Sequence, residues 1–255
     1  MRVLTLAFLV LTAAPLFAQS SQTDAPSSQP RARATPDFLF GRPDWSINVR
    51  GSWVLARKQS DWYDFVTSHL TLDDSDFNSA AVGIDAGVAL TSRADVVFGL
   101  DFSQIKSPSE YRNFVDNLRL PIEQQTRMRE ISLTGGLRFS LTERGREVGN
   151  FAWVPRTVVP YVGAGAGAVR FQVRQWGDFL DFVDHSVFSD VFRASGWTPS
   201  AHVLGGVDIH VFRRLFLTFD GRYRWAAGDL GSTWIGFDPI DLAGLRMSTG
   251  INVVF

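Results

Sequence analysis

Apolar residues alternate with polar or small ones over most of the chain after residue 44. In residues 45–56, for example, Trp45, Ile47 and Val49 are each followed by a polar residue. A period of two places the apolar side chains on one face of a strand and the polar ones on the other. The pattern predicts eight strands, over residues 45–56, 80–91, 96–103, 130–141, 158–172, 200–211, 215–226 and 243–255.

The fifth segment, 158–172, leaves open which of its faces is apolar. Val162 and the alanines that follow it could form an outward face. Tyr161, Val169 and Phe171 would then point inward, unless a β-bulge changes the phase.

The connections between these strands alternate between long and short. The long ones cover about 57–78, 104–126, 173–197 and 227–241. Six of the eight segments are 12 or 13 residues long, enough for a tilted strand to cross a bilayer. An even strand number with long loops at one end is typical of outer-membrane barrels. We therefore expect an all-β fold, a transmembrane antiparallel eight-stranded up-and-down β-barrel with both termini in the periplasm.

The polar faces of the segments carry charges beside many Gly, Ala and Ser residues. An eight-stranded interior is only wide enough to be filled by side chains, so small residues and ions fit inside while bulky apolar side chains meet lipid. Opposite charges would neutralise one another there, because an unpaired buried ion is costly. Paired carboxylates for acid–base chemistry or an ion path are the alternative interpretation. The predicted lumen charge network consists of Arg50, Asp85, Asp101, Glu130, Arg138, Asp208, Asp220, Arg222, Arg224 and Arg246.

Aromatic residues near the ends of the strands are typical of the two interfaces of a membrane barrel. The competing interpretation is a secreted β-sandwich that has these residues in its core. The barrel predicts an inner boundary at Trp45, Phe98, Phe139 and Phe255, and an outer one at Tyr223 and Trp225.

The N-terminal residues have the composition of a secretory signal, with Arg2 before an apolar stretch and the small Ala18 at the expected cut. The following residues are rich in Ser, Gln, Pro and Ala, which predicts a flexible periplasmic leader. The expected organisation is a signal peptide at 1–18, the leader at 19–43 and the outer-membrane barrel at 44–255.

Charge and cysteine content exclude several classes of function. The 255 residues include 25 Lys and Arg against 26 Asp and Glu, so there is no basic excess to indicate a nucleic-acid partner. The chain has no cysteine, which excludes disulfides, thiolate metal sites, a cysteine nucleophile and a lipidated cysteine.

Two stretches resemble a known family. Residues 160–165, Pro-Tyr-Val-Gly-Ala-Gly, resemble the Pro-Tyr-x-Gly-x-Gly strand of OmpA-, OmpX- and OmpW-like Gram-negative outer-membrane barrels. The C-terminus resembles the signal that these proteins present to the barrel-assembly machinery. The residues that match this signal are Met247, Ile251, Val253 and Phe255. The resemblance covers about 45–255 and implies the architecture, whereas the family holds pores, adhesins, enzymes and structural barrels alike.

The histidines do not indicate a metal or catalytic site. His202 and His210 lie eight residues apart on one predicted strand, about 26 Å at ~3.3 Å per residue, too far to share a metal. Asp184, His185 and Ser186 are the residue types of a hydrolase triad, but they are adjacent in a loop, whereas lipid A deacylases carry the triad on their strands. We expect no metal, no cofactor and no enzymatic activity.

The loop 173–197 combines valines and phenylalanines spaced by four with several aspartates. This spacing favours a short helix that packs on the barrel rim or the lipopolysaccharide interface, and a contact surface for an external partner is the alternative. The acidic cluster in 57–78 does not have the spacing of an EF-hand loop.

The expected function is that of an integral outer-membrane barrel with a structural or narrow-channel role and surface-exposed loops. An adhesin or partner-binding surface protein is the first alternative, and a lipid A-modifying enzyme is the second. The expected partners are outer-membrane lipid, lipopolysaccharide and, during biogenesis, the barrel-assembly machinery. We expect a monomer.

Overall fold

The computed structural model describes residues 38–149 and 151–255. The predicted signal peptide and residues 19–37 of the leader lie outside this part. Eight long strands correspond one by one to the predicted segments. They are β2 (Trp45–Ala56), β3 (Ser79–Ala89), β4 (Ala94–Val115), β5 (Pro121–Ser140), β8 (Val158–Leu180), β9 (Val187–Phe212), β10 (Leu215–Gly228) and β12 (Gly244–Val254).

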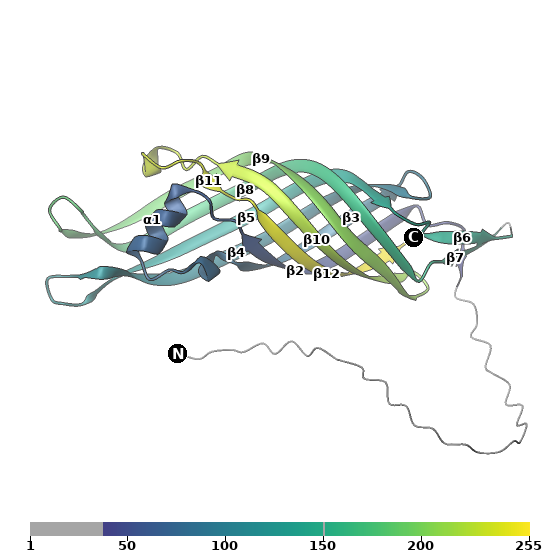
Figure 1. The fold of residues 1–255 in the computed structure, drawn as a ribbon, viewed down its shortest axis with the longest axis horizontal. Helices are drawn as coiled ribbons and strands as arrows, with labels where there is room; N and C mark the ends of the chain where they lie inside the picture. The colour runs from purple at the N-terminus through teal and green to yellow at the C-terminus, as the bar shows by residue number, and fades with distance from the viewer. Residues whose placement is uncertain (1–37, 150) are drawn as a thin grey trace, which may run out of the picture. The chain divides into compact units, whose positions relative to one another are not determined.

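The eight strands form a closed antiparallel ring (Figure 1). Each strand pairs with the next long strand in the chain, and β12 pairs back onto β2, so that Met247 lies opposite Trp53. At the seam, the amide of Phe255 donates to the carbonyl of Trp45 at 2.9 Å. A closed ring leaves no sheet edge, so the strand backbones are hydrogen-bonded without water.

The remaining elements lie at the two ends of the barrel. At the end with the C-terminus, β1 (Leu39–Phe40), β6 (Gly145–Val148) and β7 (Ala152–Pro155) form a small separate sheet, which therefore includes two residues of the predicted leader. At the opposite end lie α1 (Asp61–His69), η1 (Asp74–Phe77), η2 (Ser232–Trp234) and β11 (Ile240–Asp241). Among the described residues, no helix is long and apolar enough to cross a membrane.

The apolar faces of the strands point outward, as predicted. Leu133 is 48 % exposed and Leu217 is 37 % exposed, although both are large and apolar. Charged side chains of the same strands point inward, and Arg246 is only 6 % exposed. A soluble barrel has the reverse arrangement. The exterior therefore carries an apolar belt, which is the surface of a transmembrane barrel.

The structure shows which face of strand β8 points outward, a question that the sequence left open. Tyr161, Val169 and Phe171 all lie inside, buried, while Val162 faces outward. The pairing of β8 with β5 and with β9 contains no register shift, so the strand needs no bulge to reach this arrangement.

The prediction of a short helix in 173–197 is wrong. Strands β8 and β9 continue past the barrel wall as a hairpin that stays paired up to Leu180 and Val187. A spacing of four residues puts side chains on one face of a helix, but also on one face of a strand, since four is a multiple of two. The loop 104–126 likewise consists largely of strand, because β4 and β5 remain paired as far as Glu110 and Glu123.

Candidate functional site

The middle of the lumen holds a cluster of ion pairs from five different strands. The Arg50 guanidinium lies 2.5 Å from the Asp101 carboxylate and also pairs with Asp85. Arg246 reaches the same Asp101 oxygen at 3.0 Å, and Arg222 lies 3.7 Å from Asp85. All five side chains are at least nine-tenths buried, so each charge depends on the others for compensation.

Glycines make room for this cluster. A Cβ atom at Gly83 would collide with the Asp101 carboxylate and would lie 3.1 Å from the Arg50 guanidinium. At Gly99 a Cβ would come within 2.6 Å of Asp85. The small residues on the polar face of the sequence are therefore the space in which the ions meet.

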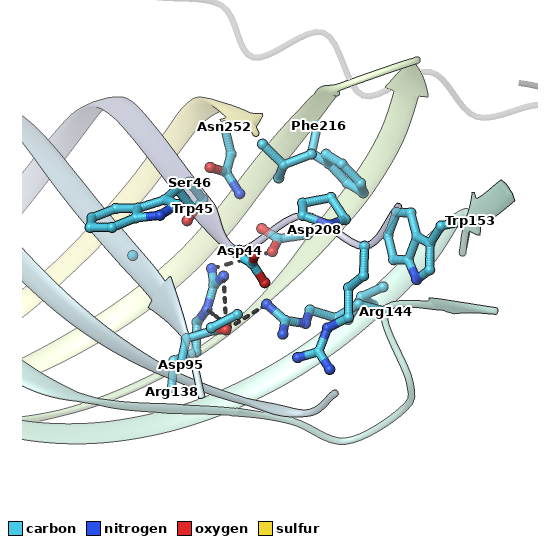
Figure 2. A pocket seen from close by; sticks show the side chains of 16 residues that line it. Asp44, Trp45, Ser46, Asp95, Arg138, Arg144, Trp153, Asp208, Phe216 and Asn252 are labelled. Atoms are coloured by element: carbon cyan, nitrogen blue, oxygen red, sulfur yellow. Dashed lines mark hydrogen bonds and ion pairs between the residues drawn. The ribbon is translucent and has the colours of Figure 1, made fainter. Parts of the chain in front are cut away.

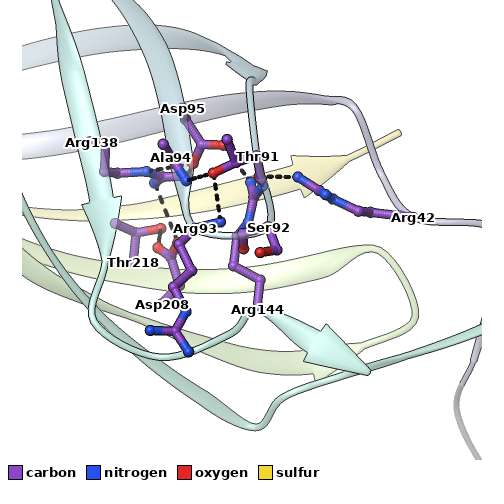
Figure 3. A network of polar contacts seen from close by, with 10 residues as sticks. All are labelled: Arg42, Thr91, Ser92, Arg93, Ala94, Asp95, Arg138, Arg144, Asp208 and Thr218. Atoms are coloured by element: carbon purple, nitrogen blue, oxygen red, sulfur yellow. Dashed lines mark hydrogen bonds and ion pairs between the residues drawn. The ribbon is translucent and has the colours of Figure 1, made fainter. Parts of the chain in front are cut away.

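A second network lies toward the end that carries the C-terminus (Figure 3). Arg138 bridges Asp95 at 3.0 Å and Asp208 at 3.3 Å, and Arg144 binds the other Asp95 oxygen at 2.5 Å. The hydroxyl of Thr218 donates to Asp208 at 2.8 Å. Asp95 thus lies between two arginines, one from strand β5 and one from the connection that follows it.

This network lies beside a pocket that opens at the same end of the barrel (Figure 2). Trp153 of β7 and Phe216 of β10 contribute apolar walls, and Asp95, Arg138 and Asp208 contribute the charged one. Arg144 lies in the connection after β5, outside the membrane-spanning strands. Burial lowers the pKa of its guanidinium, although the negative charge of Asp95 acts in the opposite direction.

The third ionic contact lies toward the opposite end. Arg224 pairs with Glu130 at 2.5 Å and donates to the carbonyl of Leu242 at 2.6 Å. Nearby, the hydroxyl of Tyr63 donates to the carbonyl of Asp241 at 3.0 Å. Burial raises the pKa of Tyr63 well above its usual value, and the carboxylates of Glu130 and Asp241 raise it further.

The structure places all ten predicted lumen residues inside the ring, but not in one continuous network: nine of them fall into the three groups, and Asp220 belongs to none of these. Five arginines face five carboxylates in this set. Asp220 is half-buried, and its Oδ1 has no hydrogen-bond partner among the described residues. Asp95 and Arg144 were missed. Asp95 has the same strand phase as the inward Asp101, which could have identified it, whereas no pattern indicates Arg144.

The remaining candidates lie apart from one another. His202 is buried in the lumen, and the ring of His210 contacts the carbonyl of Arg213 at 2.9 Å. At the tip of the β8–β9 hairpin, His185 stacks on Phe114 with ring centroids 6.0 Å apart, and Ser186 donates its amide to Asp184 at 2.9 Å. Hydrogen bonds from the side chain of Ser186 and from its amide lower the pKa of the Asp184 carboxyl group. No metal-ligand cluster of His, Asp and Glu occurs within 38–149 and 151–255.

The four residues of the C-terminal pattern lie on or just beyond β12. Met247, Ile251 and Phe255 are each at least half exposed on the outer surface, and Val253 is half-buried. The pattern is therefore a stripe on the lipid-facing side of the closing strand.

Beyond the ionic groups, the end of the barrel opposite the C-terminus contains an apolar core. Trp62 and Val66 of helix α1, both with no exposed surface, belong to one buried cluster with Val169, Phe171 and Val173 of β8. The edge of Trp62 meets the ring of Phe77, with centroids 5.9 Å apart. The first and last long connections therefore fold into this end of the barrel.

A cup of about 650 Å³, including the open space at its mouth, lies beside this core. Aromatic side chains form its walls, including Phe179 and Phe192 of the β8–β9 hairpin and Trp234 of η2. Two buried amides, Gln124 and Gln175, lie at its floor and are joined by a hydrogen bond of 2.5 Å. The Nε2 of Gln124 and the Nε1 of Trp234 have no hydrogen-bond partner in the described part of the chain.

A comparison with protein-family models finds no match, and a comparison with curated proteins finds none either. Among solved structures, the chain is similar to Neisserial surface protein A (14 % identity, 83 % of this chain and 97 % of that one, TM-score 0.45). It is also similar to the outer membrane protein OprG from Pseudomonas aeruginosa (12 %, 85 % and 98 %, 0.46). A third is Ail, the attachment invasion locus protein of Yersinia pestis (13 %, 83 % and 99 %, 0.44).

The ring of eight strands and the outward apolar belt confirm the predicted fold class and, at the level of architecture, the resemblance to OmpA-like barrels. A barrel with this belt and with both ends of its ring at one rim is a protein of the bacterial outer membrane.

Proposed function

We propose that this chain is a non-enzymatic outer-membrane barrel with a closed lumen, which anchors a folded extracellular head. The head consists of α1, η1, η2, β11 and the extended parts of β4, β5, β8 and β9. The single observation that supports this proposal best is the apolar core at the extracellular end, where Trp62, Leu70 and Ile240 are at most 1 % exposed. An open channel would need a polar, hydrated path there.

The ionic groups below this core support the same interpretation. The buried pairs of Arg50 with Asp101, Arg138 with Asp208 and Arg224 with Glu130 each join two strands that are not neighbours in the ring. A transported ion would have to break contacts that compensate buried charges, which costs several kcal/mol per uncompensated ion. A structural anchor needs no such rearrangement.

Planar-bilayer recordings test the closed lumen. The full chain should insert without conductance steps, while a general porin in the same bilayer conducts. Insertion is verified by the shift of the folded band on an unheated gel. Reproducible steps from folded protein would refute the proposal.

The enzymatic alternative is tested separately. Expression of the chain should leave the mass spectrum of lipid A unchanged, because Asp184, His185 and Ser186 occupy a hairpin tip and His185 stacks on Phe114. A new lipid A species that disappears with His185→Ala would overturn this part of the proposal.

The aromatic cup favours a second function, the binding of a small molecule at the cell surface. Pockets lined by aromatic side chains with a few polar groups are typical ligand sites. The unpartnered donors of Gln124 and Trp234 favour a flat apolar ligand that carries a hydrogen-bond acceptor.

Naphthalene-2-carboxamide is a suitable probe for the cup, and its binding can be followed by tryptophan fluorescence. Gln124→Leu should weaken binding about tenfold, the effect of one good hydrogen bond. Gln125→Leu is the matched control, since Gln125 neighbours Gln124 but points to the opposite face of β5. Equal affinity for both variants, or for naphthalene without the amide, would contradict this function.

A further inference from the structure

Four cations stand in one row across the outer surface of β4, β5, β8 and β9. The strand register places Lys106 opposite Arg127, Arg127 opposite Arg174, and Arg174 opposite Arg193. Neighbouring strands lie ~4.8 Å apart, so this cationic row spans about 14 Å. Like charges directly opposite each other on neighbouring strands destabilise a sheet, and here this occurs at three successive pairs.

No carboxylate in the described ranges compensates the row. None of the four cations takes part in an ion pair with a described residue. On the side of the row that faces the belt, the next outward-pointing residue of β5 is a further cation, Arg129. The nearest acidic residues on this face, Glu110, Glu123 and Asp178, lie four residues farther from the belt, about 13 Å along the strand.

The row is held in a geometry suited to an anion. The ring of Trp176 lies beneath three of the cations, 5.0 Å from Arg174, 5.2 Å from Arg127 and 6.0 Å from Lys106. The Nε atoms of Arg127 and Arg174 are buried, and neither has a hydrogen-bond partner in the structure as described. Stacking on an aromatic ring orients a guanidinium, so the terminal Nη groups, and not the buried Nε atoms, are the donors that would bind an anion.

The position of the row relative to the belt identifies the anion. The last apolar row on these strands is formed by Phe102, Ile131 and Trp197, with Arg170 between the last two. The cationic row lies two outward positions beyond it, where the headgroups of the outer leaflet begin. A soluble acidic partner would have to enter this layer of headgroups, whereas a membrane lipid is already there.

We propose that the cationic row binds the phosphate groups of lipopolysaccharide. Arginine guanidiniums form bidentate hydrogen bonds with phosphate, and a span of about 14 Å accommodates more than one phosphate group. The proposal rests on the outer-membrane location but is independent of the closed lumen, so a conducting barrel would leave it intact.

Purified folded protein in phosphatidylcholine vesicles, with and without lipid A, tests the proposal. The wild type should bind phosphorylated lipid A at least tenfold more tightly than Arg127→Gln/Arg174→Gln, and its affinity should fall as salt rises. Arg146→Gln/Arg156→Gln is the matched control, because it removes the same charge from exposed positions at the opposite rim. Lys106→Gln provides a milder variant if the double variant does not fold.

Three outcomes would overturn the proposal. The first is equal lipid A binding by wild type and by the variants of the row. The second is equal binding of dephosphorylated and phosphorylated lipid A. The third is displacement of lipid A by inorganic phosphate at equimolar concentration, which would indicate a site for free phosphate and not for a lipid.

Discussion

Arg50 and Asp101 are separated by 51 residues in the chain, yet their side chains meet at 2.5 Å in the middle of the lumen. Arg50 lies on β2 and Asp101 on β4, two strands away in the ring. The contact therefore crosses over β3, where a glycine leaves the space open. The β2–β3–β4 sheet alone brings Arg50 to Asp101, whereas Arg246 of β12 reaches the same carboxylate only through the β12–β2 seam that closes the ring.

Removing Asp101 should be strongly destabilising. Asp101→Asn leaves the buried Arg246 without its carboxylate partner and Arg50 with Asp85 alone, and an uncompensated buried charge costs about 3–5 kcal/mol. Glu143→Gln is the control, because Glu143 forms an exposed pair with Arg93 at 3.7 Å and such pairs contribute ~0–1 kcal/mol. Urea-induced unfolding in phospholipid vesicles measures both, and similar losses would contradict the role assigned to the central cluster.

The space at Gly83 should be as important as the charges. Gly83→Val places a branched side chain where Arg50 and Asp101 meet, and overpacking of this kind costs about 1–3 kcal/mol. Gly51→Val should be tolerated, because Gly51 is exposed on β2 with no atom within 4 Å of an added Cβ. The same unfolding measurement compares the two variants.

The extracellular core should loosen at alkaline pH through Tyr63. Its folded-state pKa is raised above the unfolded value of ~10. The contribution of the neutral phenol is therefore fully present below pH 10 and is lost as the pH rises through the folded-state pKa.

Comparison of two variants isolates this effect. Tyr63→Phe should cost about 1 kcal/mol at pH 8, where it removes the hydrogen bond to Asp241, and should reduce the further loss of stability toward pH 11. Tyr223→Phe, on the outer face, is the control. An identical pH dependence in wild type and Tyr63→Phe would show that Tyr63 is not the responsible group.

The C-terminal residue should affect assembly more than stability. The side chain of Phe255 is outside the core, while its backbone closes the seam with Trp45. Deleting Phe255 should impair insertion in cells. Phe255→Ala keeps the backbone contacts, so it should still lower the amount of barrel in outer-membrane fractions but refold normally into vesicles from urea. Normal insertion of both variants would argue against recognition of this residue by the assembly machinery.

The eight strands could be predicted because lipid outside and ions inside impose a strict period of two on every strand. That period also predicted the inward side of Arg50, Asp101 and Arg246, but not which charges would pair, since the ring brings together strands that are far apart in sequence. The apolar core under α1 was not predicted. Trp62 and Val66 are four residues apart in a short mixed segment, and they are buried in a cluster that draws residues from β4, β5 and β8, which are far away in the sequence.

The extended strands β4, β5, β8 and β9 are neighbours in the ring, whereas β10, β12, β2 and β3 end close to the belt. The protein is therefore taller on one flank than on the other, so its two flanks differ when it is viewed along the plane of the bilayer. A molecule that diffuses toward it from the short flank meets the helix and the final connection. From the tall flank it meets the extended β4–β5 and β8–β9 hairpins. A neighbouring protein in the membrane would therefore contact different elements on the two flanks.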